Sequence, residues 1–240
     1  MPPEPESKPL KHINIAIDGF SSCGKSTLAK ALARTLHYRY LDTGAMYRAV
    51  AYFALQKNLI SLEGQVKTAQ LIPLLPNMQV GFVLDAQSGA SLVALEGKTV
   101  EPFIRNLQIA TLASKVSQIR AVRDYVQILQ KQMASEKGVV MDGRDIGTVV
   151  MPQAELKIFM TAEPQVRALR RQMELENQGK PMDLQTVLEQ QIARDYEDAH
   201  RKEDPLRQAE DALVLDNTHL SAEQQLKLAL EWVKQALQQE

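Results

Sequence analysis

The residues Gly19–Thr27 read GFSSCGKST and directly follow the apolar run Ile13–Ile17. This is the pattern G-x-x-x-x-G-K-[ST], in which the backbone N–H groups of a glycine-containing turn surround a phosphate group. In that arrangement Lys25 reaches the β- and γ-phosphates, and the Ser26 hydroxyl can bind Mg²⁺. A helix that begins at Lys25 would point its positive N-terminus at the same anion. The sequence therefore predicts a nucleoside triphosphate site here, with an ordinary glycine turn as the alternative.

A second polar motif reads DGRD and begins at Asp142, directly after the apolar run Val139–Met141. Mg²⁺ takes oxygen ligands and keeps several waters, so one carboxylate at a strand end beside the phosphate loop suits it. We therefore expect Asp142 and Ser26 to hold the metal, with a turn or helix-capping role for Asp142 as the alternative. Arg144 and Asp145 then fall at the carboxyl ends of the strands, where open α/β sheets bind ligands.

Arginines recur at helical spacing in the second half of the chain. Two sets of residues three or four positions apart would each share one helix face: Arg167, Arg170 and Arg171, and then Arg194, Asp198 and Arg201. Unpaired like charges repel on a helix, so these sets suggest a bound anion, and guanidinium groups suit phosphate oxygens. Local pairing with Glu163, Glu174 and Glu197 on a solvated face is the alternative. Together with the phosphate loop, the spacing favours the anion.

The distribution of apolar residues predicts an α/β fold. Strand-like runs lie at Ile13–Ile17, Tyr38–Leu41, Val139–Met141, Leu156–Met160 and Leu213–Leu215, and helical patterns at Lys25–Leu36, Thr43–Leu55, Ile109–Ser135, Pro164–Gln178 and Ala222–Gln238. Short apolar strands separated by helices predict a parallel sheet covered on both faces. Between 63 and 103 strand-like runs with turn signals predict a small inserted antiparallel sheet. From about 164 to 204 the chain is very polar, with almost no apolar stripe between 194 and 207, so we expect this segment to be exposed, and mobile without ligand.

Composition argues against several classes of protein. The chain has 240 residues, of which 45% are hydrophobic and 24% charged, which suits one folded core with insertions. A formal net charge of −1 gives no general attraction for nucleic acid or an anionic membrane. No apolar run approaches membrane-spanning length. Cys23 is the only cysteine, so an intrachain disulfide is impossible and a cytoplasmic location is expected. Residues 1–10, rich in Pro and Glu, are expected to form a flexible tail.

Several segments of the chain resemble the bacterial cytidylate kinases, a family of nucleoside monophosphate kinases. They are IDGFSSCGKST from Ile17, LDTGAMYRAVA from Leu41, DGRDIGTVV from Asp142, KIF from Lys157 with the Arg-rich helix after it, and RDYEDAHR from Arg194. The resemblance covers nearly the whole chain, and the stretch from 63 to 103 matches the β insertion of the bacterial form. It implies a P-loop nucleoside monophosphate kinase fold, with a five-stranded parallel sheet flanked by helices, a CMP-binding insertion containing a small antiparallel sheet, and a helical lid.

The resemblance also implies an activity and a division of the chain. The activity is transfer of the γ-phosphoryl group of ATP to CMP or dCMP, with Mg²⁺ as cofactor. The core with the ATP site would comprise 11–42, 105–163 and 205–240, the CMP-binding region 43–104, and the lid 164–204. We expect a monomer whose partners are ATP and CMP or dCMP, without nucleic acid or membrane.

The same resemblance assigns roles to single residues. The ATP loop would comprise Gly19, Phe20, Ser21, Ser22, Cys23, Gly24, Lys25, Ser26 and Thr27. CMP would contact Thr43, Arg48, Arg144 and Arg201 through its phosphate, Arg194 and Asp198 through its sugar, and Ser114, Arg123 and Asp145 through its base. Phosphoryl transfer would be assisted by Lys25, Arg144, Arg167, Arg170 and Arg171, the last three from the lid.

Other functions remain open at this point. The first is a kinase of the same fold that acts on UMP, AMP or shikimate, against which the set Ser114, Arg123 and Asp145 and the β insertion argue. The second is a GTP-driven switch, which needs a guanine-selecting [NT]-K-x-D stretch that the sequence lacks. The third is a nucleic-acid-binding ATPase, which the charge balance does not favour.

Overall fold

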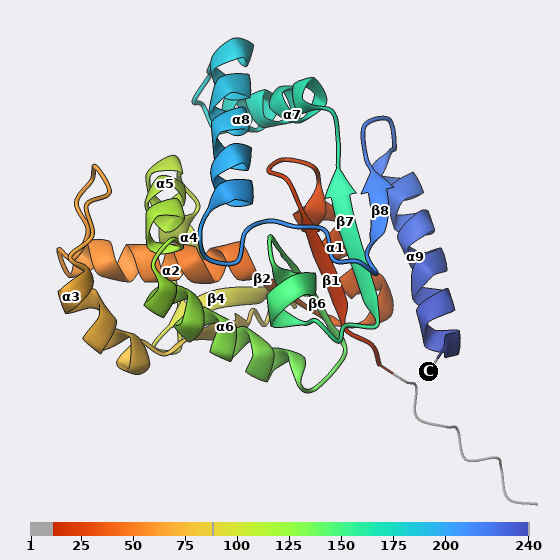
Figure 1. The fold of residues 1–240 in the computed structure, drawn as a ribbon, viewed down its shortest axis with the longest axis horizontal. Coiled ribbons are helices and arrows are strands. Elements are labelled where there is room, and N and C mark those ends of the chain that lie inside the picture. Colours follow the sequence, from red (N-terminus) through yellow and green to blue (C-terminus); the bar gives the residue numbers. More distant parts are fainter. Residues whose placement is uncertain (1–11, 88, 240) are drawn as a thin grey trace, which may run out of the picture.

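The computed structural model describes residues 12–87 and 89–239, so the expected tail at residues 1–10 lies outside the described residues. A five-stranded parallel sheet with the strand order β2-β6-β1-β7-β8 forms its centre (Figure 1). The strands are β1 Ile15–Gly19, β2 Arg39–Asp42, β6 Val139–Gly143, β7 Leu156–Thr161 and β8 Leu213–Asp216. Each strand begins and ends close to the run that predicted it, and the parallel α/β sheet is confirmed.

Helices cover both faces of this sheet. They are α1 Lys25–Leu36, α2 Thr43–Gln56, α3 Thr68–Leu71, α4 Glu101–Ile104, α5 Leu107–Val116, α6 Arg120–Ala134, α7 Pro164–Asn177, α8 Leu184–His200 and α9 Ala222–Gln239, with the short helices η1 Ile72–Asn77 and η2 Ile146–Val150. Side chains along β1 point alternately to the two faces of the sheet, and each face packs against its own layer. Ile15 and Ile17 pack with α1 and α9, whereas Ala16 packs with Met141 and η2. Within the described residues, the structure contains no helix that combines the length and the apolar character needed to cross a membrane.

The inserted segment forms the small antiparallel sheet that the sequence predicted. Its strands are β3 Val80–Leu84, β4 Ser91–Leu95 and β5 Lys98–Thr99, in that order. Val80 and Val93 are buried in the same apolar cluster as Ala49 and Val50 of α2. The insertion therefore extends the core around α2, whose N-terminus faces the main sheet at the end of β2.

One predicted helix was wrong in its extent. The expected helix Ile109–Ser135 is α5 and α6, separated by a turn at 117–119. Neither Gly nor Pro marks this turn. Instead, Ser117 Oγ donates to the carbonyl of Ser114 at 2.9 Å, and Arg123 Nη1 donates to the carbonyl of Ser117 at 3.3 Å. These polar contacts satisfy carbonyls that a continuous helix would have used itself.

The expectation that residues 194–207 are exposed was also wrong in part. Asp195 and Leu206 are buried, at 8% and 6% exposure. Asp195 accepts a hydrogen bond from Arg167 Nη1 at 2.5 Å, and the Leu206 N–H donates to the carbonyl of Asp198 at 2.8 Å. Polar contacts hold this segment in place, and a search for apolar stripes cannot detect them.

The turn from β1 into the phosphate loop requires a residue without a side chain. Gly19 has φ of +144°, and a Cβ atom there would overlap the carbonyl oxygen of Met160 on the neighbouring strand β7. Gly97, between β4 and β5, has φ of +75°, but a Cβ atom there would meet nothing within 4 Å. Both positions need a left-handed backbone, and only Gly19 also has a steric reason to be glycine.

We predict that Gly19→Ala lowers the free energy of unfolding by more than Gly97→Ala does. Both substitutions introduce backbone strain of about 1 kcal/mol or more. The clash with Met160 adds roughly 1–3 kcal/mol at Gly19 alone. Urea unfolding of the two variants beside the wild type measures the difference, and equal losses would contradict the prediction.

Asp18, next to Gly19 on β1, fixes the loop that follows β6. Its Oδ1 accepts the N–H of Ile146 at 2.8 Å, and its Oδ2 accepts the N–H of Gly147 at 2.7 Å. Burial raises the pKa of Asp18 to about 6, although these two N–H groups act to lower it. The carboxylate thus ties the strand before the phosphate loop to the segment that carries Asp145.

We predict that Asp18 makes stability depend on pH. Its pKa of about 6 in the folded chain exceeds its ordinary value of 3.8, so the folded chain holds this proton more tightly. The resulting stabilisation is fully present below about pH 4 and is lost as the pH rises through about 6, with a magnitude on the order of 3 kcal/mol. Asp18→Asn cannot titrate, so the free energy of unfolding of the wild type should fall relative to this variant over that range. Urea unfolding of both proteins across the range checks this, and a pH-independent difference would refute it.

Candidate active site

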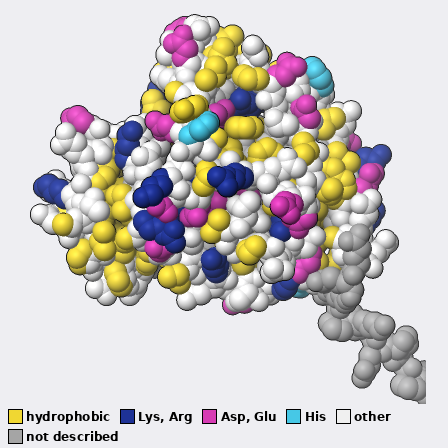
Figure 2. Space-filling view, in the orientation of Figure 1, with side chains coloured by type: hydrophobic (Ala, Val, Ile, Leu, Met, Phe, Trp, Pro, Cys, Tyr) yellow, Lys and Arg dark blue, Asp and Glu magenta, His cyan; other side chains and the backbone are white. Residues whose placement is uncertain are grey.

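A cavity of about 460 Å³ lies at the carboxyl ends of the sheet strands, between the phosphate loop and helices α2, α5, α6, α7 and α8. Most of the predicted site residues line it: Ser21, Ser22, Gly24, Lys25, Ser26, Thr27, Thr43, Arg48, Ser114, Arg123, Asp142, Arg144, Asp145, Arg170, Arg194, Asp198 and Arg201. Gly19, Phe20, Cys23, Arg167 and Arg171 are not among its lining residues. Figure 2 shows Lys and Arg side chains beside Asp and Glu side chains near the middle of the face it presents.

The lysine of the phosphate loop is hydrogen-bonded to the backbone of the same loop. Gly24 has φ of +95° and directly precedes α1, and Ser22 has φ of +55°. The Lys25 side chain is buried, and its Nζ donates to the carbonyl of Phe20 across the loop. Burial, and next Arg144, lower the pKa of Lys25. Cys23 is fully buried, and its Sγ donates to the same carbonyl at 3.0 Å.

Asp142, at the end of β6, carries the oxygens best placed for a metal ion. Its Oδ2 accepts from Ser26 Oγ at 2.7 Å, and its Oδ1 accepts from Tyr40 Oη at 2.8 Å. Burial, and next Asp42 on the adjacent strand, raise the pKa of Asp142. No group of three His, Cys, Asp or Glu side chains in the described part of the chain could hold a metal on its own. These oxygens fit a cation that takes its remaining ligands from phosphate and water, as Mg²⁺ does.

Asp42 organises the start of α2, a role that the motif search missed. Its Oδ1 caps the helix by accepting the N–H of Ala45 at 2.9 Å. Its Oδ2 accepts from Arg48 Nη2 at 3.0 Å and from Arg105 Nη1 at 2.7 Å. Burial opposes ionisation of Asp42, but these two arginines hold its pKa below the usual value. Thr43 Oγ1 donates to the backbone carbonyl at position 142 at 2.6 Å. An Asp directly before a helical pattern is the signal that could have revealed this cap.

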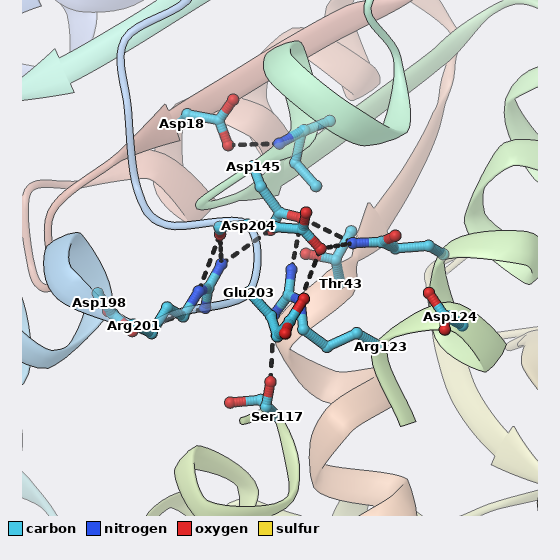
Figure 3. Close-up of polar contacts among 12 residues, drawn as sticks. Asp18, Thr43, Ser117, Arg123, Asp124, Asp145, Asp198, Arg201, Glu203 and Asp204 are labelled. Atoms are coloured by element: carbon cyan, nitrogen blue, oxygen red, sulfur yellow. Dashed lines mark hydrogen bonds and ion pairs between the residues drawn. The ribbon is translucent and has the colours of Figure 1, made fainter. Parts of the chain in front are cut away.

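Two of the three residues predicted to read a base, Arg123 and Asp145, lie together (Figure 3). Arg123 is fully buried, and its Nη2 donates to Asp145 Oδ2 at 2.6 Å. Arg201 Nη2 donates to Asp145 Oδ1 at 3.2 Å. Ser114 lines the same cavity from α5. Asp145 therefore lies between two guanidinium groups, one from α6 and one from the C-terminal end of α8.

Three arginines, one after β6 and one each on α7 and α8, line the cavity in different ways. Arg144 Nε donates to Asp198 Oδ2 on α8 at 2.7 Å. Arg170 Nη2 donates to the carbonyl of Asn217 at 2.8 Å, and its buried Nη1 has no hydrogen-bond partner in the structure. Arg194 is exposed and lines the cavity beside Asp198. Three cationic groups thus surround the space above the phosphate loop.

The two other predicted lid arginines lie elsewhere. Arg167 is buried beside the phosphate loop, where its Nη1 donates to Asp195 Oδ2 at 2.5 Å and to the carbonyl of Ser21 at 3.1 Å. Asp195 Oδ1 in turn accepts the N–H of Ser21 at 3.1 Å. Arg171 pairs with Glu174 at 3.0 Å, the local pairing considered above, and lines a second cavity of about 400 Å³. Asp195 was missed because its partner lies on another helix.

Asn217, directly after β8, was also missed and connects the phosphate loop to α7. Its Nδ2 donates to the carbonyl of Cys23 at 2.6 Å, and its N–H donates to the carbonyl of Thr161 at 2.8 Å. Its carbonyl accepts from Arg170, and its Oδ1 accepts from Gln225 Nε2 at 2.7 Å. No motif or spacing in the sequence marks this residue.

Comparison with known proteins identifies relatives of this chain. The profile of the family described as cytidylate kinase matches residues 15–235. The cytidylate kinase of Flavobacterium johnsoniae is 49% identical over 224 residues, which are 93% of this chain and 97% of that protein. That of Parabacteroides distasonis is 47% identical over 228 residues, or 95% of this chain and 99% of that protein. Because the match spans the whole cavity and nearly the whole sequence, this chain belongs to the cytidylate kinase family.

Proposed function

We propose that this protein transfers the γ-phosphoryl group of ATP to CMP or dCMP, with Mg²⁺ as cofactor. The observation that carries the proposal is one cavity lined by two chemically different groups of residues. The phosphate loop and Asp142 form one group, where a nucleoside triphosphate and a cation fit. The Arg123–Asp145 pair belongs to the other, which offers hydrogen-bonding groups for a base.

Transfer in this cavity needs no general base. The second pKa of a phosphate monoester is about 6, so the attacking oxygen of CMP is already ionised near neutral pH. Catalysis then consists of positioning and charge stabilisation by Lys25, Arg144 and Arg170. Mg²⁺ held by Ser26 and Asp142 supplies neutralisation of charge on the phosphate oxygens when it is bound.

The base pocket explains a preference for cytosine. Cytosine presents an amino donor at N4 and acceptors at N3 and O2. Asp145 accepts from N4, and Arg123 retains N–H donors beyond those that contact Asp145, Asp204 and Ser117. Uracil places an oxygen where the amino group of cytosine was, opposite a carboxylate. Such a buried mismatch costs about 1–3 kcal/mol.

The remaining site residues and regions receive roles in the same scheme. We assign the phosphate of CMP to Thr43, Arg48, Arg144 and Arg201, its sugar to Arg194 and Asp198, and the ATP side to the loop Gly19–Thr27 with Arg167, Arg170 and Arg171. We assign residues 43–104 to CMP binding, 164–204 to a lid, and 11–42, 105–163 and 205–240 to the core. The protein acts as a monomer in the cytoplasm and binds neither nucleic acid nor membrane, in keeping with its net charge of −1.

A panel of acceptors tests this function directly. Purified protein with ATP and Mg²⁺ is supplied separately with CMP, dCMP, UMP, AMP and shikimate, and ADP release is measured in a coupled assay. We expect CMP or dCMP to be the preferred acceptor. Unconverted CMP in the presence of intact ATP would overturn the proposal, and preference for another acceptor would replace it with a different kinase activity.

Asp145→Ala is predicted to reduce discrimination between CMP and UMP more than it reduces ATP binding. Loss of the carboxylate removes the acceptor for N4, and we expect the ratio of the two kcat/KM values to fall about tenfold. Asp124→Ala is a matched control, because Asp124 lies on α6 and pairs with the exposed Arg120. Equal losses of kcat/KM for CMP and UMP in Asp145→Ala would argue against this role.

The assignment of 164–204 as a lid predicts a change in hydrogen exchange. Closure over both nucleotides excludes water that would otherwise hydrolyse ATP. A bisubstrate mimic that links ATP and CMP should therefore slow amide exchange in α7 and α8 more than in β3–β5. Exchange in α7 and α8 that stays the same with the mimic bound would contradict the assignment.

A further inference from the structure

Asp204, on the segment that connects α8 to β8, lies outside the lining of the main cavity but contacts both arginines of the base pocket (Figure 3). Arg123 Nε donates to Asp204 Oδ2 at 2.9 Å. Arg201 Nε donates to the backbone carbonyl of Asp204 at 2.9 Å. Each arginine thus uses Nε for Asp204 and Nη2 for Asp145, so one residue anchors both groups that clamp the Asp145 carboxylate.

Gln127 adds a third link between the two carboxylates. Its Nε2 donates to Asp204 Oδ2 at 2.7 Å and to Asp145 Oδ2 at 3.1 Å, and the side chain is buried. Gln127 lies one helical turn after Arg123 on α6, so both side chains reach the same side of that helix. The two carboxylates and their three donors form one connected network.

The backbone of Asp204 is held in an unusual conformation. Its φ is +46°, in the left-handed region that few residues other than Gly, Asn and Asp adopt. Such a conformation persists only where the surrounding contacts fix it. Here the contacts are those to Arg123, Gln127 and Arg201, which indicates that the network determines the path of the chain at this point.

Charge balance explains why a second carboxylate is needed. Arg123 is completely buried, and a buried guanidinium requires a paired anion. Asp145 lines the cavity, where in the proposed function it also accepts a hydrogen bond from the base. Burial acts to raise the pKa of Asp204, but the hydrogen bonds from Arg123 and Gln127 hold that pKa below its usual value. Asp204 therefore keeps a negative charge beside Arg123 when Asp145 contacts a base.

We propose that Asp204 is a positioning residue for base selection, holding Arg123 through its carboxylate and Arg201 through its carbonyl so that both oxygens of Asp145 stay fixed for the base. The inference rests on the proposed function and deepens it. Part of the base specificity then depends on a residue that does not touch the nucleotide and that lies between α8 and β8.

Two substitutions at this position test the proposal. Asp204→Gly removes the side chain at a backbone conformation that glycine adopts freely. Asp204→Asn keeps an oxygen and the tolerance for positive φ, and removes the charge. We expect Asp204→Gly to raise KM for CMP about tenfold with KM for ATP within about twofold, and to lower the CMP to UMP ratio of kcat/KM about fivefold or more. Asp204→Asn should change KM for CMP and the CMP to UMP ratio in the same directions, but by smaller factors.

Glu203→Gln is the matched control. Glu203 is the adjacent carboxylate and pairs with Arg120, whose side chain is 61% exposed, at 2.9 Å. This substitution should leave the CMP to UMP ratio unchanged. A second readout does not depend on activity. Hydrogen exchange of the Arg123 Nε–H is followed by ¹⁵N NMR without nucleotide. This exchange should be slow in the wild type and fast in Asp204→Gly.

The outcomes separate the two proposals. If the wild type does not phosphorylate CMP, the proposed function fails. If the wild type phosphorylates CMP, and Asp204→Gly leaves both KM for CMP and the CMP to UMP ratio intact, the inference alone is overturned. The inference is also overturned if Glu203→Gln changes the CMP to UMP ratio as much as Asp204→Gly does. It is likewise overturned if Asp204→Gly raises KM for ATP as much as KM for CMP. Should Asp204→Gly fail to fold, a wild-type ratio in Asp204→Asn overturns the inference.

Discussion

A guanidinium group removed from water has to be paired with a carboxylate, and this requirement organises the whole cavity. Arg123 pairs with Asp145, and Arg144 pairs with Asp198. Arg167 beside the phosphate loop pairs with Asp195, and Arg48 on α2 pairs with Asp42, whereas Arg170 donates to the backbone carbonyl of Asn217. The result is a set of cationic donors that are oriented before any nucleotide arrives. Donors oriented in advance need little reorganisation when charge develops on a phosphoryl group, which is how such sites lower an activation barrier.

These pairs connect parts of the chain that the apolar core does not. The sheet and its helices are held by apolar clusters on its two faces. In contrast, Arg123 reaches Asp204 across 81 positions of sequence, and Arg144 reaches Asp198 across 54. These two ion pairs thus connect α8 and the segment after it to α6 and to the end of β6. Under the proposed function, a nucleotide phosphate would offer Arg144 another anionic partner.

The sequence alone predicted the parallel sheet, the inserted antiparallel sheet and the phosphate loop, because each depends on local patterns of apolar residues and glycine. It also predicted that Asp142 would lie beside Ser26, since both follow strands that end at one edge. It did not predict the turn at 117–119, which lacks the usual Gly or Pro. Asp195 and Asp204 were missed because each is a single polar residue whose partner lies on another element, and no periodicity marks such a pair.

The contacts of Asn217 have a consequence for the order in which the protein is completed during synthesis. The phosphate loop is made early, but the amide that holds the carbonyl of Cys23 comes from a residue 194 positions later. Until β8 has left the ribosome and joined the sheet, the phosphate loop lacks this hydrogen bond, and Arg170 of α7 lacks its bond to the carbonyl of Asn217. A nascent chain therefore completes the hydrogen bonds around its phosphate loop only after Asn217 has been made.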